Sequence, residues 1–325
     1  MIYRRFGKTG WSVSEIGFGG WGIGGNWGAV SEPQAEAALK KALELGVNFF
    51  DTAYVYGNGS SERILGAALR RWKKEVYVAT KVPAKNLVWP ATPEAPITTA
   101  FPSKWIVECA EVSLKRLGLE RIDLLQLHVW TDAWAAADEW RKAVELLKAA
   151  GKIRAFGVSV NDHEPESVVK LVSTGEIDSV QAIYNIFDPS AEQKLFPIAQ
   201  EHQVAIIARV PFDEGSLTGS LTRETRFPKG DWRAGYFRDG RLAETCERVE
   251  KLRPFLRPGV SSLSALALKF VLHHPAVSTV IPGMRSPAHV EANCAVSDGT
   301  KLPSEELKRL KEHAWPRNFY IGAWA

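Results

Sequence analysis

The chain has 325 residues, 45% of them apolar, and a formal net charge of +4, so a single large α/β domain can bury a sizeable core. No apolar run approaches the length that crosses a bilayer, and no basic run interleaves with aromatic residues as a nucleic-acid surface would. The N-terminus lacks the long apolar stretch of a secretion signal. We therefore expect a cytoplasmic protein that binds neither membrane nor nucleic acid.

Eight short apolar runs alternate with amphipathic stretches along the chain. The runs cover residues 14–20, 46–51, 75–81, 122–128, 153–159, 179–185, 204–210 and 277–283. Between most of them, apolar residues recur at helical spacing, and the stretches begin near Ser, Asp or Glu as helix caps prefer. Near-continuous apolar strands that alternate with helices indicate a parallel sheet covered by helices. We predict one α/β domain over residues 1–325, a (β/α)8 TIM barrel with an N-terminal β-hairpin.

An open, doubly wound sheet is the competing fold. Such a sheet usually carries G-x-G-x-x-G at its first strand-to-helix turn. The glycine-rich stretch at residues 17–25 runs instead into a loop, and the next helical pattern begins only near Glu32. The signal for a doubly wound sheet is therefore weak.

Long irregular segments follow the third and the seventh predicted strands. They cover residues 82–102 and 211–240. Loops of this length inside a compact domain are usually functional lids or binding loops. Because they leave the carboxyl ends of strands, where barrel active sites form, we expect them to border the active site.

Polar residues close three of the apolar runs. Asp51, Lys81 and His128 each stand at the end of a run, and Tyr56 follows Asp51 by five residues. The carboxyl ends of barrel strands converge on one face, so these side chains can share a pocket. A lysine ammonium lowers the pKa of a tyrosine from its usual value of about 10, and a carboxylate keeps a buried lysine charged. We expect Tyr56 to protonate a carbonyl oxygen while hydride reaches its carbon, with His128 orienting the substrate.

Six sequence motifs occur in the order found in aldo-keto reductases. They are DTAYVYGNGSSERILG, TK, LKRLGLERIDLLQLH, GKIRAFGVS, SLTG and IPGMRSPAHVEAN. From about Tyr3 to Asn293 the chain resembles that family. The resemblance implies a (β/α)8 barrel that uses NADPH without a Rossmann domain to reduce aldehydes or ketones. It also implies a catalytic tetrad, which falls on Asp51, Tyr56, Lys81 and His128.

The resemblance further implies a nicotinamide site at the ends of the later strands. Ser159 and Gln181 would bind the nicotinamide carboxamide. The asparagine that commonly follows the serine is Val160 here, and Asn161 stands one place later. Arg209 takes the place of the aromatic residue that usually stacks on the nicotinamide, and its planar guanidinium can also stack on a ring.

The motif near the C-terminus points to the phosphate and the adenine of the cofactor. Arg285 stands where a partner of the 2′-phosphate is usual, and Asn293 matches an adenine contact. We therefore expect NADPH/NADP+ in preference to NAD(H). The remaining cofactor contacts that we expect are Gly20, Trp21, Asp51, Pro211, Gly283 and His289.

Tryptophans in the predicted loops indicate an aromatic pocket for a small-molecule carbonyl substrate. The expected substrate contacts are Trp21, Trp27, Tyr56, Trp89, His128 and Trp130. Such a pocket suits an aromatic, apolar or sugar-derived aldehyde or ketone.

Two other functions are open from the sequence. Some barrels of this family are cofactor-binding regulatory subunits of channels, so a binding protein with negligible turnover is the main alternative. A metal-dependent isomerase or lyase is disfavoured because His, Asp, Glu and the three cysteines show no ligand spacing, and we expect no metal site.

Overall fold

The computed structural model describes residues 1–24, 27–28, 30–321 and 323. Its strands are β1 (Tyr3–Phe6), β2 (Trp11–Ser14), β3 (Phe18–Gly19), β4 (Phe49–Asp51), β5 (Tyr77–Pro83), β6 (Ile122–Trp130), β7 (Ile153–Val160), β8 (Ser179–Ile183), β9 (Ala205–Arg209) and β10 (Val277–Val280). Its helices are α1 (Glu32–Glu44), α2 (Ser60–Leu69), α3 (Ile97–Ala100), α4 (Ser103–Leu117), α5 (Asp138–Ala149), α6 (Val169–Ser173), α7 (Leu195–Glu201), α8 (Arg233–Tyr236), α9 (Arg241–Glu250), α10 (Leu263–His273), α11 (Pro287–Cys294) and α12 (Ser304–Lys311).

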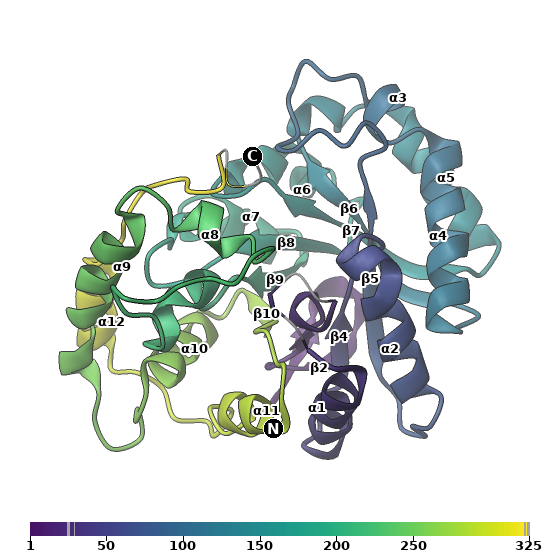
Figure 1. The fold of residues 1–325 in the computed structure, drawn as a ribbon. Coiled ribbons are helices and arrows are strands. Elements are labelled where there is room, and N and C mark those ends of the chain that lie inside the picture. Colours follow the sequence, from purple (N-terminus) through teal and green to yellow (C-terminus); the bar gives the residue numbers. More distant parts are fainter. Residues whose placement is uncertain (25–26, 29, 322, 324–325) are drawn as a thin grey trace.

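The strands from β3 to β10 form a barrel with helices around it (Figure 1). Within the described residues, these eight strands are parallel neighbours in the order β10-β9-β8-β7-β6-β5-β4-β3. The sheet closes because the Gly17 N–H donates to the Val280 carbonyl at 2.8 Å and the Gly19 N–H donates to the Pro282 carbonyl at 3.1 Å. The predicted (β/α)8 barrel is confirmed.

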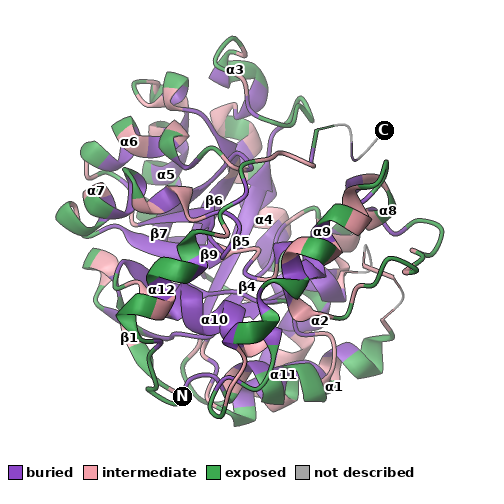
Figure 2. Cartoon of the chain, turned by 90° about the vertical axis from the view of Figure 1, so that its left-hand side faces the viewer, coloured by how far each residue is buried: buried purple, intermediate pink, exposed green. Residues whose placement is uncertain are grey.

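Helix α1 shows how the sequence pattern produces the outer layer. The Ser31 side chain caps the helix by accepting a hydrogen bond from the Gln34 N–H, and a proline lies in the first turn. The residues buried against the barrel follow the helical spacing: Ala35, Ala38, Leu39, Ala42 and Leu43. Figure 2 shows the result for the whole chain, with buried strands at the centre and green, solvent-facing surfaces on outer helices such as α9 and α12.

The N-terminal hairpin closes the barrel at the amino ends of the strands. β1 and β2 are antiparallel, as predicted, with Tyr3 opposite Ser14. The Phe6 ring stacks on Trp11 at 5.6 Å and on Phe49 at 5.3 Å between ring centroids. These rings join inward-facing residues of the strands in one buried cluster. The opposite end of the barrel therefore carries the polar residues.

The two long segments lie at the carboxyl ends of the strands, as expected. The first begins at Ala84, two residues later than predicted, because β5 extends to Pro83. The second contains the 3-10 helix η7 (Asp213–Thr218) and α8. The C-terminal segment packs on it, since Arg317 Nη2 donates to the Asp213 carboxylate at 2.5 Å and the Tyr320 hydroxyl donates to Glu214. No helix of the described residues is long and apolar enough to cross a membrane.

Candidate active site

A buried lysine links three of the four predicted catalytic residues. Lys81 lies in β5 beside the end of β4, and its Nζ donates to Asp51 Oδ2 at 2.5 Å and to the Thr52 carbonyl at 2.8 Å. The same nitrogen donates to the Tyr56 hydroxyl at 3.2 Å. An ammonium group has three hydrogens. All three are therefore used, and the phenol oxygen accepts one of them.

The Asp51 carboxylate is held on its other oxygen by two amide side chains. Gln181 Nε2 donates to Asp51 Oδ1 at 2.9 Å, and Gln126 Nε2 donates to the same atom at 3.3 Å. Asp51 and both glutamines are buried. Because each carboxylate oxygen has a donor, Asp51 stays in place as the counter-ion of Lys81.

His128 faces Tyr56 from strand β6, the neighbour of β5. Its ring lies edge-on to the Tyr56 ring, with centroids 6.4 Å apart and an interplanar angle of 86°. On the other side, the Trp89 ring contacts His128 at 4.7 Å and 90°. The structure thus brings Asp51, Tyr56, Lys81 and His128 together at one mouth of the barrel.

The charges around this cluster set its protonation states. Burial alone lowers the pKa of Lys81, but Asp51 and Tyr56 outweigh it and raise the pKa above 10.5. Burial lowers the pKa of His128 well below 6.5, and the charges of Lys81 and Arg209 add to this effect. At neutral pH the lysine is therefore charged and the imidazole is neutral.

The net direction for Tyr56 is opposite to the expected lowering. Burial raises the pKa of Tyr56 above 10.0, and Lys81 opposes this only in part because the Asp51 carboxylate acts in the other direction. The phenolate loses its hydration at this depth, and the lysine charge is already shared with Asp51. Tyr56 is consequently a protonated group that can donate.

Trp130 is wrongly predicted as a substrate contact. Its side chain is completely buried, and its ring packs on Trp134 and Trp140 between the barrel and the helices. Residues along a strand alternate between faces, which would put Trp130 beside His128. The pairing with β7 shifts between these two residues, so that His128 opposes Ser159 and Trp130 opposes Val160. This irregularity turns Trp130 to the outer face.

The other predicted aromatic residues lie at the mouth of the barrel. Trp21 stacks on Tyr56 with 6.2 Å between centroids and contacts Trp27 at 5.8 Å. Trp232, from the segment after β9, covers Trp21 at 5.2 Å. These rings form an aromatic wall over Tyr56.

The residues predicted for the nicotinamide lie next to the tetrad. Ser159 pairs with His128 and with Gln181 in the sheet. Its buried hydroxyl has no hydrogen-bond partner within the described part of the chain. The Gln181 amide nitrogen is occupied by Asp51 and Gln126, which leaves its carbonyl oxygen. An unused hydroxyl and an amide carbonyl fit a carboxamide, which both donates and accepts.

Asn161 does not fit its predicted role as a cofactor contact. Its Oδ1 accepts from the Ala91 N–H at 2.8 Å, and its Nδ2 donates to the Ala91 carbonyl and to Glu164 Oε2, each at 2.9 Å. The bonds to Ala91 therefore fasten the loop after β5 to the end of β7, and the second amide hydrogen is used on Glu164. The site of the usual asparagine, Val160, is buried on the outer face of the strand.

The glycines predicted for the cofactor lie where the barrel closes. The Gly20 N–H donates to the Asp51 carbonyl at 2.8 Å. Gly283 is exposed and bridges to Gly19. Pro211 is buried two residues after the end of β9.

The residues predicted for the phosphate and adenine gather at α11. Arg285 packs beside Gly22, and its Nη2 donates to the Gly28 carbonyl at 3.4 Å. His289 is exposed in the first turn of α11. Asn293 is buried, and its Nδ2 has no hydrogen-bond partner among the residues that are described. A cationic group just before α11 and an unused amide within this helix fit a phosphorylated adenosine.

Two residues of this region are absent from the sequence prediction. Gln126 holds Asp51, and Asp162 accepts hydrogen bonds from Trp89 and Arg209. Gln126 is the polar residue within the apolar run 122–128, on the same strand face as His128. Asp162 follows an apolar run as Asp51 does, so the same signal identifies it.

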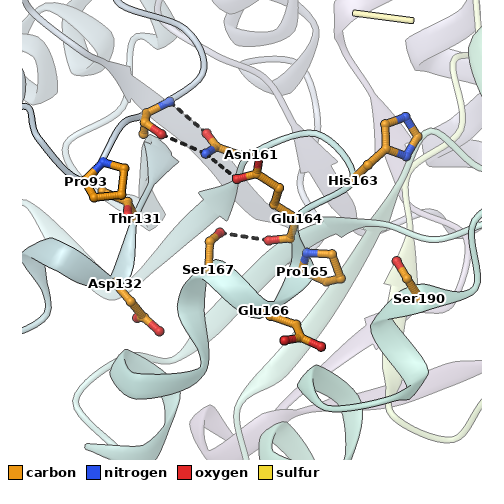
Figure 3. Close-up of a pocket in the computed structure, with 11 residues that line it drawn as sticks. Pro93, Thr131, Asp132, Asn161, His163, Glu164, Pro165, Glu166, Ser167 and Ser190 are labelled. Carbon is orange, nitrogen blue, oxygen red and sulfur yellow. Dashed lines mark hydrogen bonds between the residues drawn. The ribbon is translucent and has the colours of Figure 1, made fainter. Parts of the chain in front are cut away.

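Figure 3 shows a cavity lined by residues such as Asn161, Glu164 and Ser167. It has a volume of about 520 Å³ and lies between the loop after β5 and the segments after β6 and β7. Asn161 and Ser167 bond to Glu164 there, and no tetrad residue lines the cavity. No group of metal-ligating side chains occurs among the described residues.

Comparison with known proteins agrees with this geometry. Residues 15–314 match the model of the Aldo/keto reductase family. The chain is 32% identical over 316 residues to aldo-keto reductase YhdN of Bacillus subtilis (strain 168), covering 95% of this chain and 92% of that protein. The holo form of aldo-keto reductase AKR11C1 from Bacillus halodurans superimposes with a TM-score of 0.76 at 31% identity, covering 97% of this chain and 96% of that one.

Another relative is named as a channel subunit instead of a reductase. A putative voltage-gated potassium channel subunit beta of Schizosaccharomyces pombe (strain 972) is 30% identical over 336 residues, covering 95% of this chain and 92% of that protein. The family model and these relatives match nearly the whole length of the chain, and this establishes the class of protein. The chain belongs to the aldo/keto reductase family, a family of oxidoreductases that use nicotinamide cofactors.

Proposed function

We propose that the protein is an NADP(H)-dependent oxidoreductase that reduces an aldehyde or ketone to the alcohol, with Tyr56 as the general acid. The observation that carries this proposal is the hydrogen bond from Lys81 Nζ to the Tyr56 hydroxyl. Because the phenol oxygen accepts this bond, its own hydrogen is available to another acceptor. The Asp51 carboxylate keeps the Lys81 ammonium charged.

The proposed proton transfer gives separate roles to Tyr56, Lys81 and His128. The reduced nicotinamide, when bound, supplies the hydride. As the carbonyl oxygen gains negative charge, Tyr56 gives it the phenolic proton, and the Lys81 ammonium stabilises the resulting phenolate. The neutral His128 imidazole lies beside Tyr56 and can donate its own N–H to the same oxygen.

The polar groups near α11 support NADPH as the cofactor. Arg285 would bind the 2′-phosphate, because a guanidinium pairs with phosphate through parallel hydrogen bonds. Asn293 would bind the adenine, and Ser159 with Gln181 would hold the carboxamide. The tryptophans at the mouth favour an aromatic, apolar or sugar-derived carbonyl compound.

Oxidation of NADPH in the presence of a carbonyl panel tests the proposal. The panel contains aromatic, aliphatic and sugar-derived aldehydes and ketones, with NADH assayed in parallel. We expect turnover that depends on the carbonyl compound and is faster with NADPH than with NADH.

A cofactor-binding regulatory subunit is the second candidate, because of the similarity to the putative channel subunit. Tight NADPH binding in calorimetry, combined with no turnover across the panel, favours this second candidate over the reductase.

A further inference from the structure

Asp162 lies two residues after the end of β7 and connects two residues at the mouth of the barrel. Its Oδ2 accepts from Trp89 Nε1 at 2.9 Å, and its Oδ1 accepts from Arg209 Nη2 at 2.8 Å. The carboxylate is buried, with 6% of its side chain exposed. A single rigid group thus joins a residue of the loop after β5 to the residue that ends β9.

Trp89 belongs to the substrate side of the mouth. Its ring meets the His128 imidazole edge-on at 4.7 Å. The neighbouring Leu87 and Val88 are exposed, so this part of the loop presents an apolar rim. The indole has one donor, its N–H, and that donor is used on Asp162. The bond to Asp162 therefore fixes the angle at which the ring stands beside His128.

Arg209 belongs to the cofactor side of the mouth. It ends β9 and replaces the stacking residue that the family resemblance implies. Its Nη2 is shared between Asp162 and the Val160 carbonyl, the latter at 3.1 Å. Its charge contributes to the low pKa of His128. A change in the position of Arg209 consequently moves the carboxylate that holds Trp89.

We propose that Asp162 is a positioning residue that couples Arg209 on the cofactor side to Trp89 on the substrate side, so that the bound cofactor sets the angle of the Trp89 ring, against which a flat apolar carbonyl compound binds. This inference rests on the proposed function. The coupling is reciprocal, because two ligands that share one element change each other's affinity by the same factor.

The competing interpretation is that the bond merely fastens the loop. Trp105 provides the matched control for it. Trp105 lies in the first turn of α4, and its Nε1 donates to the Pro83 carbonyl at 2.8 Å, where the same loop leaves β5. Its ring contacts Tyr54 instead of His128. Trp89→Phe and Trp105→Phe therefore each remove one indole hydrogen bond and keep an aromatic ring.

The binding test uses benzamide, a flat carbonyl compound that the enzyme cannot reduce. Calorimetry measures its affinity with and without saturating NADP+. We expect NADP+ to strengthen benzamide binding at least about fivefold in the wild type, and we expect this factor to approach one in Trp89→Phe. Trp105→Phe should keep the wild-type factor. An equal factor in both variants and the wild type would overturn the inference.

The kinetic test separates coupling from loop fastening. We expect Trp89→Phe to raise KM for benzaldehyde about fivefold, the factor lost with one hydrogen bond, and to raise KM for propanal by less, while kcat changes little. Asp162→Asn should raise both KM for benzaldehyde and the dissociation constant of NADPH. Equal effects of Trp89→Phe and Trp105→Phe on both aldehydes would contradict the inference. If instead the wild type fails to turn over any carbonyl, the proposed function itself is wrong.

Discussion

The side-chain nitrogen of Lys81 has a separate acceptor for each of its three hydrogens: Asp51, the Thr52 carbonyl and Tyr56. This saturation explains why a lysine can stay charged while its side chain is fully buried. Burial raises the pKa of Tyr56, and the lysine charge, which is shared with Asp51, opposes this only in part. In the proposed mechanism Tyr56 is therefore protonated before the reaction, and Lys81 stabilises its phenolate only afterwards.

These pKa directions predict the pH dependence of the reaction. The pKa of His128 is lowered well below 6.5, and the pKa of Tyr56 is raised above 10.0. Between these values the imidazole is neutral and the phenol is protonated, so kcat/KM for carbonyl reduction should stay level from about pH 6 to pH 9. Initial rates across that range measure it. A titration step near pH 6.5 would show that His128 changes its charge during catalysis.

The tetrad could be predicted from residue types at the ends of apolar runs, but neighbouring positions could not. Trp130 faces the helices instead of the predicted pocket, because the strand pairing shifts after His128. The side-chain amide of Asn161 is occupied by hydrogen bonds to Ala91 and Glu164. The orientation of Trp130 and the bonding of Asn161 depend on which loop contacts which strand. The alternation of side chains along a strand does not predict these contacts.

At the scale of elements, the C-terminal segment holds the long segment after β9. Arg317 pairs with the buried carboxylate of Asp213, and the Tyr320 hydroxyl donates to Glu214. The Tyr320 ring also stacks on Trp232, with 5.9 Å between centroids. Since Trp232 covers Trp21, this contact supports the aromatic wall of the site. The sequence predicts the long segment but not its partner, because the two lie about a hundred residues apart and meet only in the folded chain.

Glu214 makes this contact sensitive to pH. Burial raises its pKa from 4.5 to about 8. A carboxyl whose pKa is higher in the folded state binds its proton more tightly when folded. Its contribution to stability is therefore complete below pH 4.5 and is lost as the pH rises through about 8.

Glu214→Gln should remove this loss, because the amide keeps an oxygen for the Tyr320 hydroxyl and carries no charge. We expect the Tm of the variant to fall less than that of the wild type between pH 5 and pH 8, as measured by differential scanning calorimetry. Glu247→Gln is the control, since Glu247 forms an exposed ion pair with Arg223. If the Tm of Glu214→Gln falls with pH as steeply as that of the wild type, Glu214 is already ionised in the folded protein.

At the scale of the whole molecule, barrel closure brings the first and last strands of the sheet together beside Asp51. Gly19 bridges to Gly283, and Gly20 donates to the carbonyl of Asp51. The alternation of strands and helices is sufficient to predict this architecture, because the barrel strands are buried on both faces and most helices on one. The exact closing contacts depend on backbone approach, which residue patterns do not specify.

Gly19→Ala should weaken the closure. A Cβ at Gly19 would lie 2.7 Å from the Ile281 carbonyl oxygen and 2.9 Å from that of Pro282, whereas one at Gly283 would have no atom within 4 Å. We expect Gly19→Ala to lower the free energy of unfolding by roughly 1–3 kcal/mol. Gly283→Ala should stay close to the wild type in urea unfolding. Equal stability of both variants would show that the closing strands can separate without cost.

The most direct test of the proposed mechanism compares Tyr56→Phe with the wild type. Calorimetric titration with NADPH and the rate of carbonyl-dependent NADPH oxidation are measured on the same preparations. We predict that the variant binds NADPH as the wild type does and that its turnover falls by a factor of about 10² to 10⁴, the usual contribution of a general acid. Turnover near the wild-type rate would contradict the assignment of Tyr56 as the proton donor.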